Sequence, residues 1–565
     1  MPEALTRDTR KARGAFFTPA PIAKSIVDWA VRCASDRILD PSCGDAAFLL
    51  PAATKLLTLS AASCAGGPGP NFRAQINGVD IDSPTAKTAR ERLTAIGVEA
   101  RIEVSNFFDL PANAVYDAVI GNPPYIRYQG FNGTSRTAAR EAAARAGVSL
   151  TALASSWAPF IVHASQFLRP GGRLGFVLPT ELLSVNYAAP IRRFLFNSFA
   201  SIELVFFERL VFKEAEANVI LLLADGYGGS TSHATIRRAR DESDLSNLSS
   251  PSSAADPENT WSPLNPEGKW TELLAPAPAR AKLAVLRNRA ALTPLSEWGS
   301  IRLGAVTGNN SYFTLSPLHA RELALERRDL VRISPSGSAH LHGLSLTSAM
   351  LTRLGKKERG TLLFRPREPL SFAAKSYVQM GREIGVDLAY KCRARKPWYI
   401  VPLPPVPNLL LTAMNTDSPR IVANAARVHH LNSVYGVYLL DGLVQLGTEL
   451  LPLAGLNSAS MLSAELSGRS YGGGILKLEP REMCTWLVPS PRLIRERAEE
   501  LRSIKGEVGR YLRRGQFLQA IEAVDGALGL TDTRYGSSEV DGLFSAAVSI
   551  ACHRKDRGRR QREKT

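Results

Sequence analysis

The 565-residue chain contains no long apolar run and few cysteines. It has no stretch of about 20 consecutive apolar residues, the length that crosses a bilayer as a helix, and its start, MPEALTRDTRKARG, lacks the apolar core of a secretory signal. Its six cysteines show no Cys-x-x-Cys spacing, which argues against a disulfide framework and a zinc site. We therefore expect no membrane association, no bound metal, and a location in the cytoplasm or on the nucleoid.

Acidic residues are scarce relative to basic ones. The chain has 69 lysines and arginines against 52 aspartates and glutamates, a formal net charge of +17. Such an excess favours a polyanionic partner, with nucleic acid as the leading candidate. The length exceeds one ordinary hydrophobic core, so two or three domains are expected.

Residues 1–225 alternate short β-type runs with helix-length segments, which predicts an α/β domain with a mostly parallel sheet. The last two runs have too little chain between them for a crossover helix, so they should form an antiparallel hairpin. The predicted strands are RILD (37–40), INGVDI (76–81), YDAVIG (116–121), RLGFVL (173–178), IELVFF (202–207) and NVILLLA (218–224).

The composition then changes. Residues 226–285 begin with a segment rich in Ser, Gly, Pro and charge, which indicates a linker. A second ordered domain, of α+β type, is expected over 286–490. Residues 491–565 should comprise a helical segment and, from His553, a basic tail (HRKDRGRRQREKT) that adds nonspecific affinity for DNA.

The strongest local motif is Asn122-Pro123-Pro124-Tyr125, directly after the predicted strand YDAVIG. An amino group on an aromatic base is a poor nucleophile, because its lone pair is delocalised, and hydrogen-bond acceptors for both of its N–H groups free that lone pair. The Asn122 side chain and the Pro123 carbonyl can supply two acceptors, which the consecutive prolines hold rigidly. Tyr125 offers a ring for an extruded base. The alternative is a rigid proline turn that merely ends a strand, but ligands bind at the carboxyl edge of such sheets.

A second motif, Asp40-Pro41-Ser42-Cys43-Gly44-Asp45, follows the strand RILD. Its single glycine suits a nucleoside cofactor without a pyrophosphate, although any strand-to-helix turn can look similar. Asp80, at the end of INGVDI, can accept hydrogen bonds from both hydroxyls of a ribose, with Asp82 in reserve; the alternative is a solvated acid.

Phe17-Thr18-Pro19 precedes the first predicted helix. This segment has two equally good interpretations. Thr18 can be the N-cap of that helix, with Pro19 in its first turn, or the segment can help to hold a cofactor.

In this order, the motifs resemble those of the gamma-class DNA adenine-N6 methyltransferases with a C-terminal target-recognition domain, as found in restriction-modification systems. The matching segments are GAFFTPAPIA (14–23), ILDPSCGDAAFL (38–49), GVDID (78–82), SNFFDL (105–110) and IGNPPYI (120–126). The resemblance implies a Rossmann-like S-adenosylmethionine-dependent methyltransferase domain over 1–225 and a DNA-recognition domain over 286–490.

The resemblance also implies roles for individual residues. Asp40, Pro41, Cys43, Gly44 and Asp80 would contact the cofactor, Phe17, Thr18 and Pro19 its methionine end, and Asn122 to Tyr125 the target adenine of double-stranded DNA. Asn106 stands where the family has an acid that contacts the cofactor's adenine, and Phe107 should pack against that ring. Phe212 matches an aromatic that packs against the extruded base, but it can equally be a core residue of the hairpin.

Beyond 225 the resemblance is weaker. Within RVHHLNSVYGVYLL (427–440), the side chains of His429, His430, Asn432 and Tyr435 can all contact phosphate or base edges, but the target sequence cannot be assigned. A cognate restriction endonuclease is a possible partner.

Other classes remain open on the sequence. NPPY also occurs in methyltransferases that act on release-factor glutamine or on RNA, which are usually shorter. A non-catalytic DNA-binding subunit on a methyltransferase fold is a third alternative, against which the intact NPPY and Asp80 argue.

Overall fold

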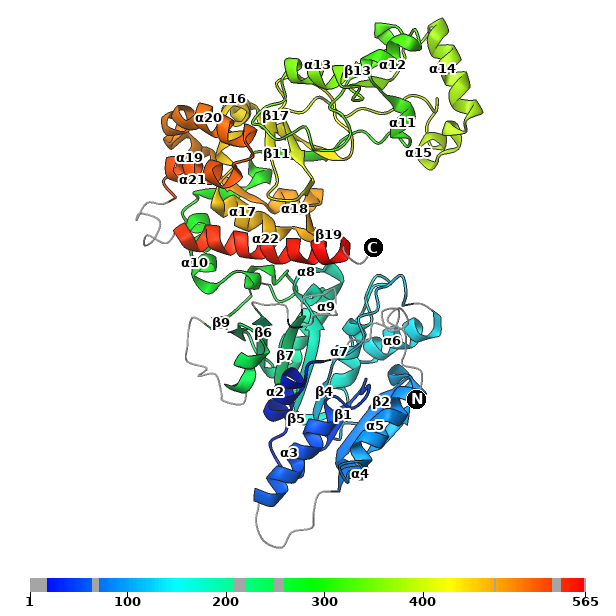
Figure 1. Ribbon diagram of the computed structural model, residues 1–565, viewed down its shortest axis with the longest axis vertical. Helices are drawn as coiled ribbons and strands as arrows, with labels where there is room; N and C mark the ends of the chain where they lie inside the picture. Colours follow the sequence, from blue (N-terminus) through cyan, green and yellow to red (C-terminus); the bar gives the residue numbers. More distant parts are fainter. Residues whose placement is uncertain are drawn as a thin grey trace. The chain divides into compact units, whose positions relative to one another are not determined.

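A computed structural model describes residues 18–62, 71–131, 133–207, 211, 219–247, 259–263, 265–471, 474–530 and 540–562. The chain divides into two compact units, Met1–Leu273 and Leu274–Thr565 (Figure 1). Each has its own hydrophobic core, and each is described by itself. No helix among the described residues has both the length and the apolar character needed to cross a membrane.

The first unit is built on one large sheet, with nine strands among the described residues. β1 lies between β2 and β4 and is parallel to both, so strand addition switches direction beside β1. The sheet order is β3 (Arg101–Val104), β2 (Ile76–Asp80), β1 (Ile38–Asp40), β4 (Tyr116–Gly121), β5 (Leu168–Pro179), β7 (Val219–Tyr227), β6 (Phe199–Phe207), β8 (Ala234–Ala239) and β9 (Thr260–Trp261).

The predicted hairpin is confirmed, because β7 runs antiparallel to both β5 and β6. β3 was missed by the sequence reasoning; only one of its four residues is buried, so it lacks the apolar run that marks the other strands. Helices cover the sheet: α2 (Ala20–Ala30), α3 (Leu49–Ala62), α4 (Phe72–Gln75), α5 (Ser83–Thr94), α6 (Gly133–Arg145), α7 (Trp157–Ser165), α8 (Glu181–Ser184) and α9 (Ala189–Ser198).

The prediction of a linker over residues 226–285 is wrong for much of that range. Strand β8 pairs in parallel with β6, and β9 pairs with β8, so the sheet continues past residue 225. Trp270 is fully buried and packs edge-on against Trp261 and Phe196. Two large rings in an otherwise polar segment attach it to the first unit, a tertiary effect that average composition hides.

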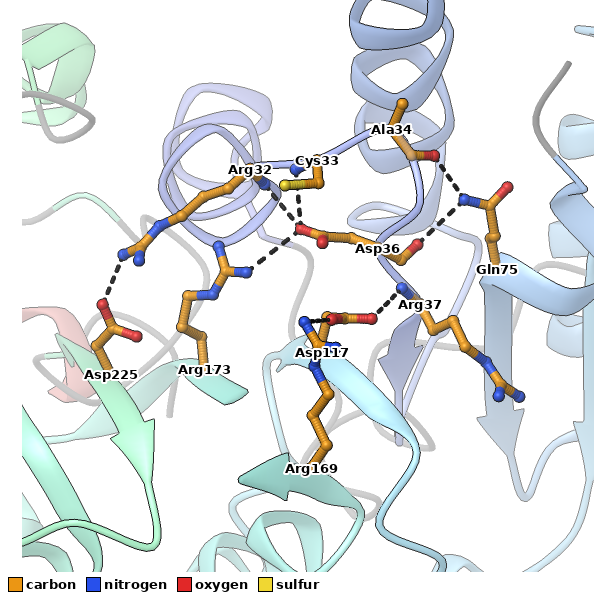
Figure 2. A network of polar contacts seen from close by, with 10 residues as sticks. All are labelled: Arg32, Cys33, Ala34, Asp36, Arg37, Gln75, Asp117, Arg169, Arg173 and Asp225. Carbon is orange, nitrogen blue, oxygen red and sulfur yellow. Dashed lines mark hydrogen bonds and ion pairs between the residues drawn. The ribbon is translucent and has the colours of Figure 1, made fainter. Parts of the chain in front are cut away.

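A network of charged side chains lies at the end of the sheet where β1 begins (Figure 2). Asp36 Oδ2 accepts hydrogen bonds from the main-chain N–H groups of Arg32 (2.8 Å) and Cys33 (3.2 Å) and from the Arg173 guanidinium (3.3 Å). Asp117, on β4, accepts the Arg37 N–H at 2.7 Å. These bonds tie the α2–β1 connection to β4 and β5. They occupy the end of the sheet where β1 starts, whereas the carboxyl ends of the parallel strands lie at the opposite end.

The second unit combines small sheets with helices. Its described strands form the sheets β11 (Gly299–Leu303)–β18 (Val434–Leu439)–β15 (Leu409–Thr412)–β17 (Ile421–Ala423), β12 (Thr314–Leu315)–β14 (Leu362–Phe364)–β13 (Leu330–Arg332), β16 (Met414–Asn415)–β20 (Ile475–Lys477)–β19 (Arg469–Tyr471), and β10 (Leu292–Pro294)–β21 (Leu487–Pro489).

The helices of this unit are α10 (Ala277–Asn288), α11 (Asn310–Phe313), α12 (Pro317–Glu322), α13 (Ser348–Lys356), α14 (Phe372–Glu383), α15 (Tyr390–Arg393), α16 (Val444–Ala454), α17 (Ser458–Ser467), α18 (Pro480–Thr485), α19 (Pro491–Glu496), α20 (Ala498–Arg513), α21 (Phe517–Leu528) and α22 (Val540–Arg562). Leu501, Ile521 and Ala547, from the last three, belong to the same core as Trp298 and Val437. The boundary expected at residue 490 therefore does not separate two cores.

The expected basic tail begins inside helix α22. Arg554 is buried, and its guanidinium forms two hydrogen bonds with the Glu465 carboxylate on α17, at 2.7 and 3.0 Å. It also donates to the main-chain carbonyls of Thr416, Asp417 and Gly474. The segment from His553 thus contributes to the core of the second unit at Arg554, where a free tail was expected.

Candidate active site

A pocket lies where strands β1, β2, β3 and β4 end. The described residues around it enclose about 560 Å³, a size typical of small-molecule and cofactor sites. It occupies the switch point of the sheet, the place where open α/β sheets bind ligands. Of the predicted site residues, those that line it are Thr18, Cys43, Gly44, Asp80, Asn106, Phe107, Asn122 and Pro124.

The remaining predicted residues do not line this pocket. Pro19, Asp40, Pro41, Pro123 and Tyr125 are in the described part of the chain but outside the lining. Phe17 and Phe212 lie outside the described residues, so their expected roles stay predictions.

The turn after β1 is shaped around its backbone. Gly44 has a φ of +53°, a left-handed conformation that glycine adopts without strain. Its N–H donates to Asp80 Oδ2 at 2.9 Å, which joins the ends of β1 and β2. Ser42 reaches to the other side and donates to the main-chain carbonyl of Asn122 at 3.3 Å. The turn therefore connects both neighbouring strand ends.

Asp40 is fully buried next to this turn. Its Oδ1 accepts the Ser42 N–H at 3.0 Å, and its Oδ2 has no hydrogen-bond partner among the described residues. Burial raises the pKa of this carboxyl to about 8. A Cβ atom on Gly121 would come within 2.7 Å of Asp40 Oδ1, so the glycine before NPPY makes room for this carboxyl group.

Asp80 and Asp82 have different positions and partners. Both aspartates line the pocket, and Asp80 Oδ1 accepts the Asp82 N–H at 2.8 Å. Asp82 is the N-cap of α5 and accepts from the main-chain N–H and the hydroxyl of Thr85, at 3.2 and 2.6 Å. A carboxylate has about four acceptor positions, so Asp80 retains the capacity for ribose hydroxyls.

Thr18 does not cap the first helix, contrary to the structural alternative for this segment. Pro19 occupies the N-cap position of α2, without a side-chain cap, and Pro21 lies in the first turn. The Thr18 hydroxyl instead accepts a hydrogen bond from Asn122 Nδ2 at 3.1 Å. This bond anchors the Asn122 amide beside Thr18, with the amide nitrogen toward the hydroxyl and the carbonyl oxygen away from it.

Ser156 holds the NPPY segment from the side of α7. Its hydroxyl donates to the Pro124 carbonyl and accepts the Ile126 N–H, the latter at 2.9 Å. Tyr125 packs against the core of the unit, and its hydroxyl donates to the Val177 carbonyl at 2.9 Å. Burial raises the pKa of Tyr125 well above its ordinary value, so the hydroxyl stays protonated.

Aromatic side chains form one wall of the pocket. Phe107 stacks on Phe160, with ring centroids 5.3 Å apart, and contacts His163, whose pKa burial lowers to about 4. His163 is therefore neutral and acts as an aromatic support for Phe107. Asn106 makes no side-chain cap bond to the following 3-10 helix, η1 (Phe107–Asp109), which leaves its side chain at the pocket.

The sequence reasoning missed several pocket residues. Ser42 and Ser156 link the motifs through hydrogen bonds, and Ile81, 66% exposed, offers an apolar edge beside Asp80. Phe108 and Phe131 add to the aromatic wall. A signal was present for Ile81, because an apolar residue between two acids at a strand end is unusual, whereas nothing local marks Ser156.

The residues present fit S-adenosylmethionine. Asp80 offers a carboxylate for the ribose, and the Phe107 side of the pocket offers an apolar wall for an adenine ring.

Comparison with known proteins agrees with this geometry. Residues 3–226 match the N-6 DNA Methylase family, and residues 267–528 match the C-terminal domain of type II methyltransferase M.Eco57I. The second match begins close to the boundary between the two units, and together the two matches span most of the chain.

Individual proteins similar to this chain include type II methyltransferases. The chain is 27% identical over 495 residues to type II methyltransferase M.XamI of Xanthomonas campestris pv. amaranthicola, covering 84% of this chain and 85% of that protein. It is 22% identical to M.AccI of Acinetobacter calcoaceticus, covering 85% and 86%. Among solved structures, the type IIG restriction endonuclease BpuSI aligns with a TM-score of 0.46 and 13% identity, over 98% of this chain and 67% of that one.

These matches decide among the alternatives left open by the sequence, namely methylation of RNA, methylation of protein glutamine, and DNA binding without catalysis. The family model over residues 3–226 is that of DNA N6 methylases, and such enzymes use S-adenosylmethionine. The chain therefore belongs to the N6-adenine DNA methyltransferases of restriction-modification systems, with an M.Eco57I-type C-terminal domain.

Proposed function

We propose that the NPPY segment holds an adenine swung out of double-stranded DNA and that Asn122 and Pro123 accept hydrogen bonds from its amino group. The main support is the bond from Asn122 Nδ2 to Thr18, which anchors the amide and in this structure leaves its oxygen directed away from Thr18. Two acceptors on one amino group pull its nitrogen toward tetrahedral geometry and release the lone pair for attack. After methyl transfer, the amino group loses one proton to water.

The cofactor residues are proposed from the pocket lining. Asp80 accepts hydrogen bonds from the ribose hydroxyls, Asn106 contacts the adenine amino group, and Phe107 supports the adenine ring. Thr18, Cys43 and Gly44 line the region toward Asn122, with Phe17, Pro19, Asp40 and Pro41 in the same two segments. S-adenosylmethionine, when bound, supplies an electrophilic methyl group on a sulfonium.

The second unit is proposed to recognise the DNA sequence. Its match to the M.Eco57I C-terminal domain and the basic character of the chain support this role. We also propose that a cognate restriction endonuclease cleaves the same sequence when it is unmodified, as expected for a modification enzyme, and that the protein acts on DNA of the nucleoid in the cytoplasm.

The direct test is the product. DNA incubated with the protein and labelled S-adenosylmethionine, then digested and analysed by mass spectrometry, should contain N6-methyladenine. Label found only in N4-methylcytosine, or only in RNA or protein, would contradict the proposed role of NPPY.

Removing the Asp80 carboxylate should weaken cofactor binding. Asp80→Ala is expected to cost about 1.5–3 kcal/mol of binding free energy, the loss typical of hydrogen bonds to a charged group. Calorimetry with S-adenosylmethionine measures it. Asp82→Asn is the matched control, because Asp82 caps α5 and an asparagine keeps that function. Equal affinities of Asp80→Ala and the wild type would remove Asp80 from the ribose site.

Tyr125 should act through its ring. Tyr125→Ala is expected to lose roughly 1–3 kcal/mol of stacking with the extruded base, and a mismatched target adenine should restore part of the activity, because extrusion then costs less. Tyr125→Phe loses the bond to the Val177 carbonyl but keeps the ring. It should therefore remain close to wild-type activity. Single-turnover methylation of matched and mismatched duplexes measures both variants; an alanine defect of equal size on the two substrates would exclude a role in extrusion.

A further inference from the structure

The second unit contains a lobe with a core of its own. We call residues 304–405 the basic lobe; helices α11 to α15 group together in it (Figure 1). Its core is aromatic: Tyr312 and Tyr377 stack with centroids 4.5 Å apart, and each hydroxyl donates to the other's main-chain carbonyl. A Cβ atom on Gly381 would come within 2.6 Å of both Tyr312 and Trp398, so α14 packs tightly onto these rings. The lobe therefore holds α14 in a defined orientation.

Positive charge is concentrated in the basic lobe. Residues 304–405 contain 16 lysines and arginines and 7 aspartates and glutamates, a net charge of +9. The whole chain carries +17, so just over half of its excess charge falls in less than a fifth of its length. Such a local excess attracts a polyanion.

The end of α14 and the segment that follows it expose apolar side chains beside this charge. Ile384 is 64% exposed, Leu388, in the 3-10 helix η7 (Val386–Leu388), 68%, and Tyr390, at the start of α15, 74%. A Cβ atom on Gly385 would lie 3.8 Å from Leu388 Cδ1, so the Leu388 side chain folds back over the end of α14. Exposed apolar side chains gathered in one short segment mark a candidate interaction surface.

The cations next to this surface are solvent-exposed. Lys391, Arg393 and Lys396 are exposed, and among the described residues none of the three takes part in an ion pair. Lys391 Nζ lies 5.3 Å from the centroid of the Tyr390 ring. We call Ile384, Leu388, Tyr390 and these three cations the α14–α15 tip.

Other candidates for DNA contact in this unit fit less well. His430 and Tyr435, which the sequence suggested as readers of phosphates or bases, are buried, whereas Asn432 of the same set is exposed but carries no charge. His429 is half-buried, and its ring contacts the Pro404 carbonyl. On β19 and β20, Arg469 pairs with Glu482 and Lys477 with Glu479, so the charge of these two side chains is already compensated.

We propose that the α14–α15 tip is a DNA-contacting surface, with Lys391, Arg393 and Lys396 against phosphates and with Leu388 and Tyr390 in a groove of the duplex. Unpaired cations supply the attraction for the backbone, while exposed leucine and aromatic side chains are the type that enter grooves and wedge between base steps. The combination favours DNA over a protein partner, because a docked protein would need acidic groups for every cation. The inference rests on the proposed role of the second unit in recognition.

The test compares the salt dependence of binding. In the full-length protein, Lys391→Gln, Arg393→Gln and Lys396→Gln are combined, and affinity for a short duplex of random sequence is measured by fluorescence anisotropy over a range of salt. Each lost phosphate contact should reduce the slope of log K against log salt by about 0.9, so a fall of roughly 3 is expected. The matched control combines Lys24→Gln, Arg73→Gln and Lys87→Gln, three exposed cations of the first unit that already have acidic partners. The control should leave the slope unchanged.

The apolar part has a separate readout. Leu388→Ser combined with Tyr390→Ser should weaken binding roughly 5- to 100-fold at every salt concentration, since apolar contacts release no counterions. A slope for the basic triple variant equal to that of the control overturns the proposal. So does an apolar variant that changes self-association in sedimentation while DNA affinity stays at the wild-type value, because the surface then binds protein. Formation of N6-methyladenine is measured in the same samples; a protein that methylates DNA with an unchanged slope refutes the α14–α15 tip and leaves the proposed function intact.

Discussion

Asn122→Ala should reduce single-turnover methyl transfer by at least two to three orders of magnitude, roughly the loss seen when one stabilising hydrogen-bond group is removed from a catalytic site. The alanine cannot accept from the target amino group, whose lone pair then stays delocalised. Cofactor and DNA affinities should change little, because Asp80 and the second unit are untouched. Matched and mismatched substrates should be affected equally, in contrast to Tyr125→Ala.

Thr18 provides the internal control for this prediction, as a positioning residue. Thr18→Val keeps the shape and removes the hydroxyl that fixes the Asn122 amide, so it should lower the rate with a smaller effect than Asn122→Ala. Thr18→Ser keeps the hydroxyl and loses the methyl group, so it should retain the wild-type rate. If the methyl group had a merely structural role, Thr18→Ser would lower the rate instead. Wild-type transfer by Asn122→Ala would show that NPPY is not the catalytic segment here.

Arg554→Met should destabilise the second unit by about 3–5 kcal/mol, the cost of leaving one partner of a buried ion pair uncompensated. Both side chains of the Arg554–Glu465 pair are 2% exposed, so Glu465 would stay buried without its counterion. Truncation before His553 should have at least the same effect. Urea denaturation followed by tryptophan fluorescence measures the loss, since Trp298 and Trp486 belong to this core.

The neighbouring residue supplies the matched control. Lys555 also pairs with an acid, Asp417, but both side chains are more than 40% exposed, and surface pairs contribute little. Lys555→Gln should therefore cost at most about 1 kcal/mol. Combining Arg554→Met with Glu465→Leu removes both charges and should recover much of the stability. If Arg554→Met unfolds at the same urea concentration as the wild type, α22 is not part of the folded unit.

Much of the first unit could be predicted because its signals are local. The buried strands β1, β2, β4, β5, β6 and β7 are short apolar runs, and the DPSCG and NPPY motifs follow two of them directly. Since β1 and β4 are neighbours in the sheet, residues 80 positions apart meet, and the sequence order of motifs was enough to anticipate one site. The mostly parallel sheet with an antiparallel β7 was predicted for the same reason.

The tertiary structure decided what depends on distant partners. Strands β8 and β9 lie in a segment of linker-like composition and become part of the sheet only by pairing with β6, with Trp270 covering them. Thr18 looked like a helix cap, but Pro19 is the N-cap of α2, and the Thr18 hydroxyl accepts a hydrogen bond from Asn122. Ser156 joins the site because α7 brings it to the NPPY carbonyls, a contact across 32 residues that no local pattern encodes.

The sequence alone determined the candidates for the chemistry, because the proposed acceptors, the acid proposed for the ribose and their order along the chain are properties of short segments at strand ends. Only the tertiary structure decided the fate of the charges. A run of lysines and arginines near the end of the chain looks uniformly solvated, yet Arg554 is buried against Glu465. In the basic lobe, by contrast, Lys391, Arg393 and Lys396 are exposed and form no ion pair with any residue that the structure describes. The physical reason is that a charged residue is identified by its type, whereas its burial and its partner depend on which element packs against it.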